Sequence, residues 1–468
     1  MKRLVSLLLI FCCQFTLTAA EHKLAGDWVG KITTPMGELR LVFHLQHDGQ
    51  EWKAWFDSPD QGVNGILANI ITLNEENIKT ETPQIGATFQ ATLINAKLSA
   101  TWSQAGIANT MEMLQMEAPL AGPNRPQTPK APYKYAIEEV SFINENAAIK
   151  LVGTLTKPQT GDIKGKILLV SGSGPQDRDS DILGHKFFHV IADYLTNQGF
   201  AVLRYDERGV GQSGGDFSQA HFQDLQLDTE AAITFLNNHA ELKDLPLGLI
   251  GHSEGGFMVG KLASELPLID FIVMMAAPGI DGDKLFLEQT AAILSAEGYS
   301  KSYIDERMGI QRRAVKLLLT SPPNIDLINQ IKGLAKEMLS LEVGHNEITD
   351  EAIKNVVAML ASNTIRDIIK FEPEHAYKNI NVPTLALYAE LDLQVLADSN
   401  MTGIEKIFSK KPKLLTAKKY KQFNHLFQPT ETGRPSEYAM ISQTISPIVL
   451  QDISNWLDKI LIAGSVQK

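Results

Sequence analysis

The chain has 468 residues, of which 44% are hydrophobic and 21% are charged, and its formal net charge is −11 at pH 7. This composition is that of a folded globular protein and excludes a disordered or low-complexity chain. The acidic excess argues against a nucleic-acid-binding groove and against docking on an anionic membrane surface. At about 100–200 residues per domain, the length predicts two or three domains.

The N-terminus has the pattern of a secretory signal peptide over residues 1–20. Lys2 and Arg3 supply positive charge, an apolar run follows over residues 4–17, and residues 18–20 offer small side chains for cleavage. The apolar run is short for a hydrocarbon layer of about 30 Å, so we expect no stable membrane insertion. We expect an exported protein and favour the periplasm, with secretion beyond it as the alternative.

The chain has two cysteines, Cys12 and Cys13, and both lie within the expected signal peptide. Cleavage after Ala20 would therefore leave a mature chain without cysteine. Such a chain would use no disulfide, no thiol nucleophile and no cysteine-bound metal.

Residues 21–122 are strand-like, with short alternating runs of apolar and polar residues separated by turns such as Asp48-Gly49. This pattern predicts a small all-β domain, either a sandwich or a barrel. Four of the five tryptophans fall in this segment, where we expect them to fill the β core: Trp28, Trp52, Trp55 and Trp102.

A proline-rich linker is expected over residues 123–132, because closely spaced prolines stiffen an extended connection. In residues 133–468, apolar strands alternate with amphipathic helices after a hairpin over 138–143 and 149–156. This order predicts a mostly parallel sheet with helices on both faces. Strands are expected near 166–170, 201–205, 247–251, 271–276, 384–389 and 413–417, and helices near 185–198, 222–239, 255–266, 398–410 and 448–461.

One long stretch, residues 279–377, interrupts this alternation. It has helical periodicity and no convincing strand. We interpret it as a helical cap inserted between two strands, in a position to cover the carboxyl ends of the sheet.

The pattern G-x-S-x-G occurs twice, around Ser253 and around Ser213. A nucleophile on a sharp strand-to-helix turn needs small neighbours, because the surrounding backbone approaches closely. Only Ser253 stands between an apolar strand and a helix, whereas Ser213 follows a loop. We therefore predict that Ser253 is the nucleophile and that Ser213 is a turn residue.

A serine nucleophile needs a histidine base and a carboxylate that orients it. In the α/β-hydrolase arrangement the chain order is serine, acid, histidine. His425 is the one histidine after the last expected strand, and Asp392 follows the strand expected at 384–389. We predict the triad Ser253, Asp392 and His425, with Glu390 as the substitute for the acid.

The oxyanion hole is expected to use the amide of Glu254, directly after the nucleophile, and a second amide from the loop after the first central strand. Ser173 is the candidate for this second amide, and Gly174 is the next choice. The loop lacks the G-K-[ST] pattern of a phosphate cradle. His185 and His189 are four residues apart without an H-E-x-x-H frame, so we interpret them as helix-face residues and expect no metal.

These motifs together resemble the α/β-hydrolase superfamily, and their combination is similar to the bacterial EstD-like esterases, which are grouped with serine aminopeptidase and dienelactone-hydrolase relatives. The motifs are S-G-S-G-P-Q-D-R-D from Ser171, R-Y-D-E-R-G-V-G-Q-S from Arg204, G-H-S-E-G-G from Gly251, L-D-L-Q-V from Leu391 and N-H-L-F from Asn424. The resemblance implies a carboxylesterase that needs no cofactor and acts on short or medium acyl chains, with the same triad. Many relatives have His-Gly where this chain has Ser171-Gly172. The segment from Phe56, F-D-S-P-D-Q-G, resembles the β domain that precedes the hydrolase in exported members.

We therefore expect a serine carboxylesterase that acts on a small-molecule ester through an acyl-enzyme. The first alternative is a serine peptidase or aminopeptidase with the same triad. It would need carboxylates for a substrate ammonium group, and the cap offers Asp281, Asp283 and Glu288. The second alternative is a non-catalytic binding protein of the cell envelope.

Overall fold

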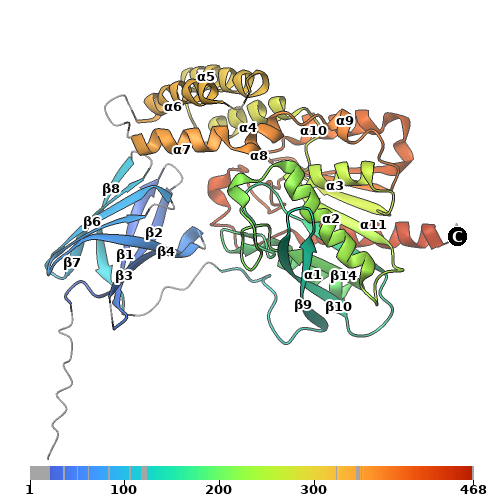
Figure 1. Cartoon of the computed structure of the whole chain (residues 1–468), viewed down its shortest axis with the longest axis horizontal. Coiled ribbons are helices and arrows are strands. Elements are labelled where there is room, and N and C mark those ends of the chain that lie inside the picture. The colour runs from blue at the N-terminus through green and yellow to red at the C-terminus, as the bar shows by residue number, and fades with distance from the viewer. Residues whose placement is uncertain are drawn as a thin grey trace, which may run out of the picture.

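The computed structural model describes residues 22–34, 37–49, 51–61, 63–82, 85–104, 107–117, 124–322, 324–343, 348 and 350–465. They form an N-terminal β-barrel and a larger unit in which helices cover a sheet (Figure 1). The expected signal peptide, both cysteines and Pro123 lie outside the described residues. Across these ranges, no helix combines the length and the apolar character that crossing a membrane requires.

The N-terminal unit is a closed antiparallel barrel. Its strands are β1 (Gly26–Thr34), β2 (Gly37–His47), β3 (Trp52–Ser58), β4 (Val63–Leu73), β5 (Asn77–Thr82), β6 (Ala87–Ile94), β7 (Lys97–Gln104) and β8 (Ile107–Gln115). Each strand pairs with its neighbours in sequence, and β1 also pairs with β8, which closes the ring. Closure gives each described strand a partner on both sides, and β1 meets β8 at Trp28 and Val29. The predicted all-β domain is therefore confirmed, as a barrel.

Aromatic side chains fill the centre of the barrel. The ring of Phe43 lies 5.2 Å from that of Phe56 and 4.8 Å from that of Phe89, measured between centroids. Trp28 and Trp102 are buried in the same core, and Trp52 packs at its edge. The expectation that all four tryptophans fill the core is wrong for Trp55, which lies outside the core and stacks on His44.

The second unit contains an eight-stranded sheet in the order β18-β17-β16-β15-β11-β14-β10-β9, in which five neighbouring pairs are parallel and the last two are antiparallel. The predicted fold class, a mostly parallel α/β-hydrolase sheet, is confirmed. The strands are β9 (Tyr135–Asn144), β10 (Ile149–Pro158), β11 (Gly165–Val170), β14 (Phe200–Tyr205), β15 (Leu247–His252), β16 (Phe271–Met275), β17 (Thr384–Ala389) and β18 (Leu415–Tyr420).

Helices pack on both faces of this sheet. One face is covered by α1 (Phe187–Asn197) and α11 (Pro447–Ser465). The other face is covered by α2 (Phe222–Asn238), α3 (Glu254–Glu265) and α10 (Ala397–Ile407). The predicted strands that are fully buried agree with the structure to within a residue at each end, because a buried parallel strand is a continuous apolar run.

The edge strand β18 is the least well predicted strand of the sheet. It was expected at 413–417 and runs two to three residues later. Residues Pro412–Leu414 form a 3₁₀ turn, and β18 is half exposed along its length. Its sequence therefore lacks the apolar run that marked the central strands.

The cap helices lie between β16 and β17 and form a layer at the top of Figure 1. They are α4 (Gly282–Ala296), α5 (Lys301–Thr320), α6 (Ile325–Val343), α7 (Asp350–Ala361), α8 (Asn363–Ile369) and α9 (Pro373–Ala376). Apolar residues of α5, α6 and α7 form a core separate from that of the sheet. The described part of this insertion contains no strand.

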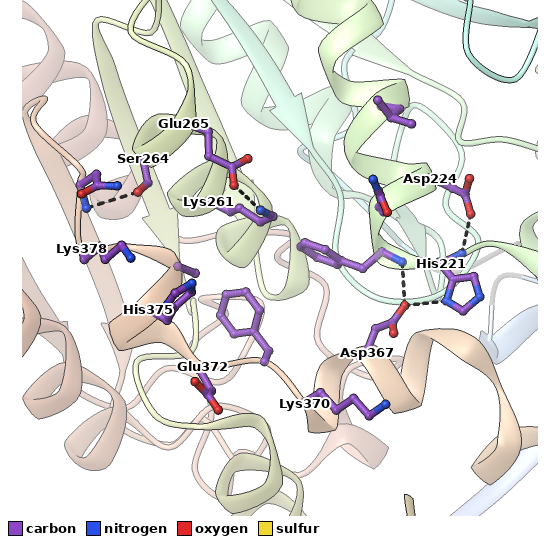
Figure 2. Close-up of a pocket in the computed structure, with 16 residues that line it drawn as sticks. His221, Asp224, Lys261, Ser264, Glu265, Asp367, Lys370, Glu372, His375 and Lys378 are labelled. Carbon is purple, nitrogen blue, oxygen red and sulfur yellow. Dashed lines mark hydrogen bonds and ion pairs between the residues drawn. The ribbon is translucent and has the colours of Figure 1, made fainter. Parts of the chain in front are cut away.

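The end of the cap is attached to α2 and α3 around a pocket of about 890 Å³ (Figure 2). Asp367 of α8 accepts hydrogen bonds from His221 Nδ1 at 3.1 Å and from the amide of Phe222 at 3.0 Å. The ring of Phe371 stacks on that of Phe257, with 4.2 Å between centroids. Two hydrogen bonds to Asp367 and one aromatic contact therefore hold this end of the cap against the sheet helices.

The described part of the expected linker is bound to the second unit by hydrogen bonds. The guanidinium group of Arg125 donates to the carbonyl oxygens of Leu183, Ala439 and Ile441. Gln127 exchanges hydrogen bonds with the backbone near Ile445. The expected domain limits at 122 and 132 stay predictions, because residues 118–123 lie outside the described ranges.

Replacing Phe43 with alanine is expected to lower the free energy of unfolding of the barrel by about 3–5 kcal/mol, because the cavity left between two rings cannot fully close. Urea unfolding followed by tryptophan fluorescence measures this, since four of the five tryptophans lie in this segment. Leu67 is 62% exposed, so Leu67→Ala should change stability by less than about 0.5 kcal/mol. Equal losses in the two variants would contradict the described core.

Candidate active site

Ser253 occupies a sharp turn between β15 and α3. Its backbone has φ +55° and ψ −118°, a conformation that costs a non-glycine residue about 1–3 kcal/mol. The amide of Ser253 donates to the carbonyl oxygen of Met275 at the end of β16, at 2.9 Å. Strain of this kind persists only where the surroundings hold the residue in place, and it is typical of a functional position.

The glycines around Ser253 are required by close backbone contact. A Cβ atom on Gly251 would lie 2.1 Å from the carbonyl oxygen of Gly255, and a Cβ atom on Gly255 would lie 2.1 Å from the carbonyl oxygen of Val170. Neither contact can be relieved by moving a flexible side chain. The glycines of the G-x-S-x-G pattern are therefore needed because α3 packs closely against the ends of β15 and β11.

The predicted acid and base are paired. His425 Nδ1 lies 2.7 Å from Asp392 Oδ2, and both residues are buried. The other carboxylate oxygen of Asp392 accepts hydrogen bonds from the amides of Gln394 and Val395, each at 2.8 Å. The carboxylate is thus fixed by its own loop and can hold one tautomer and one orientation of the imidazole.

Glu390, the alternative candidate for the acid, forms no hydrogen bond with His425 among the described residues. It is exposed, and its carboxylate accepts from the amide of Gln422 at 3.2 Å. Asp398 pairs with Lys419 at 2.5 Å. Among the three carboxylates after β17, the structure therefore brings Asp392 to His425.

The sharp turn of Ser253 between β15 and α3 is called here the elbow. His252 connects this elbow to the loop that carries His425. Its Nε2–H donates to the carbonyl oxygen of His425 at 3.0 Å, and the two rings lie 4.7 Å apart. Burial, together with the nearby His425 side chain, lowers the pKa of His252 to about 3. His252 is therefore neutral at working pH and acts as a fixed donor beside Ser253.

Among the described residues, no hydrogen bond joins the hydroxyl group of Ser253 to His425; the two segments are joined by the hydrogen bond from His252, the residue before Ser253, to the carbonyl oxygen of His425. Catalytic hydrogen bonds are often long in a structure without substrate and tighten in the complex. The structure thus brings His425 together with Asp392 and places both beside the elbow.

The loop 171–176, called here the oxyanion loop, passes directly over the nucleophile. A Cβ atom on Gly172 would lie 3.2 Å from Ser253 Cβ and 3.3 Å from the carbonyl oxygen of His252. Gly174 has φ +84°, and Glu254 opens α3 next to Ser253. The three residues predicted to donate to the oxyanion, Ser173, Gly174 and Glu254, thus belong to segments at the elbow. Which of their amides binds the oxyanion stays a prediction.

The two histidines considered for a metal have different partners in the structure: the ring of His189 lies 3.7 Å from Asp179. His185 does not lie on a helix face as expected: it belongs to β13 (His185–Lys186), where its ring is buried and contacts Thr444 and Tyr438. The helix α1, which carries His189, begins only at Phe187. Within the described ranges, no group of three histidine, cysteine, aspartate or glutamate side chains is placed to hold a metal ion.

Three consecutive charged residues after β14 lie near the site and were not predicted from the sequence as part of it. Asp206 accepts hydrogen bonds from Arg178, Glu207 from Ser171 and from the amide of Gln176, and Arg208 donates to Asp228. The first two connect β14 to the loop after β11. A signal was present in the sequence, since three charges directly after a buried strand need buried partners.

Two hollows border the sheet helices and the cap. The pocket in Figure 2 is lined by α2, α3 and the segment of α8 and α9, and none of the triad residues borders it. A second hollow of about 640 Å³ lies between α4 and α10 and borders Asp392, Ala291 and Leu396. The second hollow is therefore the one next to the predicted triad.

A parallel sheet with a strained serine between strand and helix, and with a buried Asp–His pair beside it, defines an α/β-hydrolase. Residues 184–428, just over half of the chain, match the family described as "Serine aminopeptidase, S33". The chain belongs to this family and is a serine hydrolase, as its motifs predicted.

The chain is similar to several known proteins. The chain is 23% identical over 360 residues to esterase EstD of Thermotoga maritima, covering 76% of this chain and 77% of EstD. An esterase structure from Pyrococcus furiosus is 15% identical and covers 73% of this chain and 97% of its own, with a TM-score of 0.40. A proline iminopeptidase structure from Mycobacterium smegmatis is 13% identical and covers 70% and 100%, with a TM-score of 0.41.

The low pKa of His252 makes a pH-dependent contribution to stability. Below about pH 6.5 the unfolded chain protonates this histidine while the folded chain does not, so the contribution is complete above pH 6.5 and is lost as the pH falls toward 3. Between pH 6.5 and pH 5 we expect the wild type to lose about 2 kcal/mol more unfolding free energy than His252→Asn.

Urea unfolding of both proteins across this pH range, followed by near-ultraviolet circular dichroism, measures the difference. The difference between the two proteins is the informative quantity, because other groups that titrate in this range are common to both. An identical pH slope in the wild type and in His252→Asn would contradict a neutral, buried His252.

Proposed function

We propose that the protein is a serine carboxylesterase that hydrolyses small-molecule esters with short or medium acyl groups, using Ser253, His425 and Asp392. The observation that carries the proposal is the buried Asp392–His425 pair, at 2.7 Å, beside the strained turn of Ser253. The similarity to esterase EstD supports an ester rather than another acyl substrate.

In the acylation step, His425 takes the proton of Ser253 Oγ as this oxygen attacks the ester carbonyl carbon. Asp392 accepts a hydrogen bond from the Nδ1–H group of His425 and stabilises the imidazolium that forms. The carbonyl oxygen becomes an oxyanion, which the amide of Glu254 and an amide of the oxyanion loop stabilise by about 3–4 kcal/mol per donor. His425 then returns the proton to the leaving alcohol.

In the deacylation step, water takes the place of the alcohol. His425 removes a proton from this water as it attacks the acyl-enzyme, and the same amides stabilise the second oxyanion. The carboxylic acid leaves and the hydroxyl group of Ser253 is restored. The chain's own side chains and amides supply every group that these steps use.

A peptidase activity is the second candidate, and one contact favours it. Of the three cap carboxylates considered for a substrate ammonium group, Glu288 borders the hollow next to Asp392. Asp281 instead pairs with Lys284 at 2.7 Å. Glu288 accepts a hydrogen bond from Ser399 at 2.7 Å, which leaves its second oxygen for a ligand.

Export to the periplasm, with cleavage after Ala20, is part of the same proposal. Its support is the sequence pattern of residues 1–20. N-terminal sequencing of the protein recovered from a periplasmic extract tests it: a chain that starts at Glu21 is the expected result, and a cytoplasmic chain that retains residues 1–20 contradicts it.

Ser253→Ala is expected to abolish hydrolysis of p-nitrophenyl esters and labelling by a fluorophosphonate, because it removes the oxygen that is proposed to attack the substrate. The control is Ser213→Ala, at the other G-x-S-x-G match, which should still be labelled since Ser213 Oγ binds backbone groups of Asp206 and Val152. Persistent labelling of Ser253→Ala would contradict the assignment. Faster hydrolysis of aminoacyl p-nitroanilides than of esters would select the peptidase.

Asp392→Asn is expected to lower kcat by about 10³–10⁴-fold, because an amide in place of the carboxylate favours the wrong imidazole tautomer. Glu390→Gln, two residues away and exposed, is the matched control and should keep kcat within about 2-fold of the wild type. Steady-state kinetics on one ester measures both. A large loss in Glu390→Gln with little loss in Asp392→Asn would reverse the assignment of the acid.

A further inference from the structure

Two buried carboxyl groups behind the elbow have no part in the reaction described above. Glu207 follows β14 and Glu254 opens α3, and each side chain belongs to a residue that is 8% exposed. Both border one small cavity, together with Ser171 and Gly172 of the oxyanion loop. The two carboxyl groups therefore lie on the inner side of the segments that carry the predicted oxyanion donors.

Glu207 holds both ends of the oxyanion loop. Its Oε1 accepts from Ser171 Oγ at 2.7 Å, its Oε2 accepts from the amide of Gln176 at 2.8 Å, and its own amide donates to the carbonyl oxygen of Gln176 at 3.1 Å. Ser173 and Gly174 lie between these two attachment points. A loop with two glycines loses much conformational entropy on ordering, and fixing its ends limits the positions that its amides can take.

The residues on either side of Glu207 each have a partner of opposite charge, but Glu207 does not. Asp206 binds the guanidinium group of Arg178, with one contact at 2.7 Å, and Arg208 binds Asp228 through two nitrogens at 2.6 and 2.9 Å. Among the described residues, neither Glu207 nor Glu254 forms an ion pair. The carboxyl group of Glu207, which holds both ends of the oxyanion loop, is thus without a countercharge.

Glu254 has one oxygen without any partner. Its Oε2 is buried and forms no hydrogen bond within the described structure. The cavity that it borders has a volume of about 20 Å³, room for about one water molecule. A buried, unpaired carboxylate is costly, so the group favours its protonated form.

We propose that Glu207 is a positioning residue for the oxyanion loop, and that Glu207 and Glu254 form a carboxyl pair that must retain a proton for efficient turnover. The inference rests on the proposed esterase function and concerns the same site. In the active form the pair carries at most one negative charge. At high pH the retained proton is lost to solvent, and both carboxyl groups are then charged.

The surroundings of the pair support this protonation state. Burial raises the pKa of Glu207 to about 8 and that of Glu254 to about 7. Hydrogen bonds from Ser171 and from the amide of Gln176 act in the opposite direction and lower the pKa of Glu207. Two nearby carboxylates raise it further: Glu254 of α3 and Asp228 of α2, the latter paired with Arg208. Asp367 of α8 likewise raises the pKa of Glu254. Each of these carboxylates opposes a further negative charge.

The proton matters because negative charge develops close by during the reaction. The amide of Glu254 and the oxyanion loop are the predicted donors to the oxyanion, and the pair lies directly behind them. In a site of low effective dielectric, a second negative charge at the pair would oppose the oxyanion and weaken its stabilisation. Loss of the proton should therefore lower kcat more than it changes KM.

The experiment measures kcat and KM for an aliphatic ester by pH-stat titration from pH 6 to pH 9, for the wild type, Glu254→Gln, Glu207→Gln and Glu207→Ala. Glutamine cannot ionise, and Glu254→Gln keeps the backbone amide. We expect kcat of the wild type to fall by about 10-fold from pH 6 to pH 9, and by less than about 3-fold in Glu254→Gln. Glu390→Gln is the control and should keep the alkaline fall of the wild type.

The positioning role predicts a second difference. Glu207→Ala should lower kcat by about 10²-fold with KM changed by less than about 3-fold, since it releases both ends of the oxyanion loop. Glu207→Gln keeps an acceptor oxygen and should restore part of this loss. Wild-type kcat in Glu207→Ala would overturn the positioning role. An unchanged alkaline fall in Glu254→Gln would overturn the proton-retaining pair.

Labelling by a fluorophosphonate separates this inference from the proposed function. A wild type that is neither labelled nor active on esters would overturn the esterase proposal itself. If the wild type is labelled and active, the pH profile decides the inference alone. Glu254→Gln tests the pair even where Glu207→Ala fails to fold, which circular dichroism of each variant establishes.

Discussion

The close contact between the backbones of β11, β15 and α3 is the constraint on which the site depends. At Gly251 and Gly255 the carbonyl oxygens of neighbouring segments occupy the space of a side chain. Because α3 must begin within this contact, Ser253 is held at positive φ, and its side chain is raised above the sheet. The same contact brings the loop after β11 over the nucleophile, so one packing requirement places both Ser253 and Gly172.

The parallel sheet brings the other side chains of the site to one edge. The carboxyl ends of parallel strands lie along one edge, so the segments after β11, β14, β15 and β17 meet there although they are far apart in the chain. In this way one edge of the sheet brings together the loops that carry Ser171, Glu207, Ser253 and Asp392. His425 comes from the loop after β18 and is fixed from two sides, by Asp392 at its ring and by His252 at its carbonyl oxygen.

The sequence allows predictions of features that depend on local pattern, and the triad assignment stays such a prediction. Ser253 could be chosen over Ser213 because strand, turn and helix follow one another in the chain, and Asp392 and His425 because chain order restricts the choice. Features that depend on strand adjacency could not be read. Glu207 reaches the oxyanion loop only because β14 lies beside β11. The barrel strand β5, whose sequence is N-I-K-T-E-T, lacks the apolar run that marks a buried strand.

The cap leaves the sheet after β16 and returns at β17, and these two strands are hydrogen-bonded neighbours. Its two ends are therefore close together, and its helices have a hydrophobic core of their own. An insertion of this kind can be lengthened, shortened or exchanged during evolution while the order of the sheet strands stays the same. Substrate range and catalytic chemistry are then carried by separately variable parts of one chain, and related enzymes can diverge in what they accept without rebuilding the elbow.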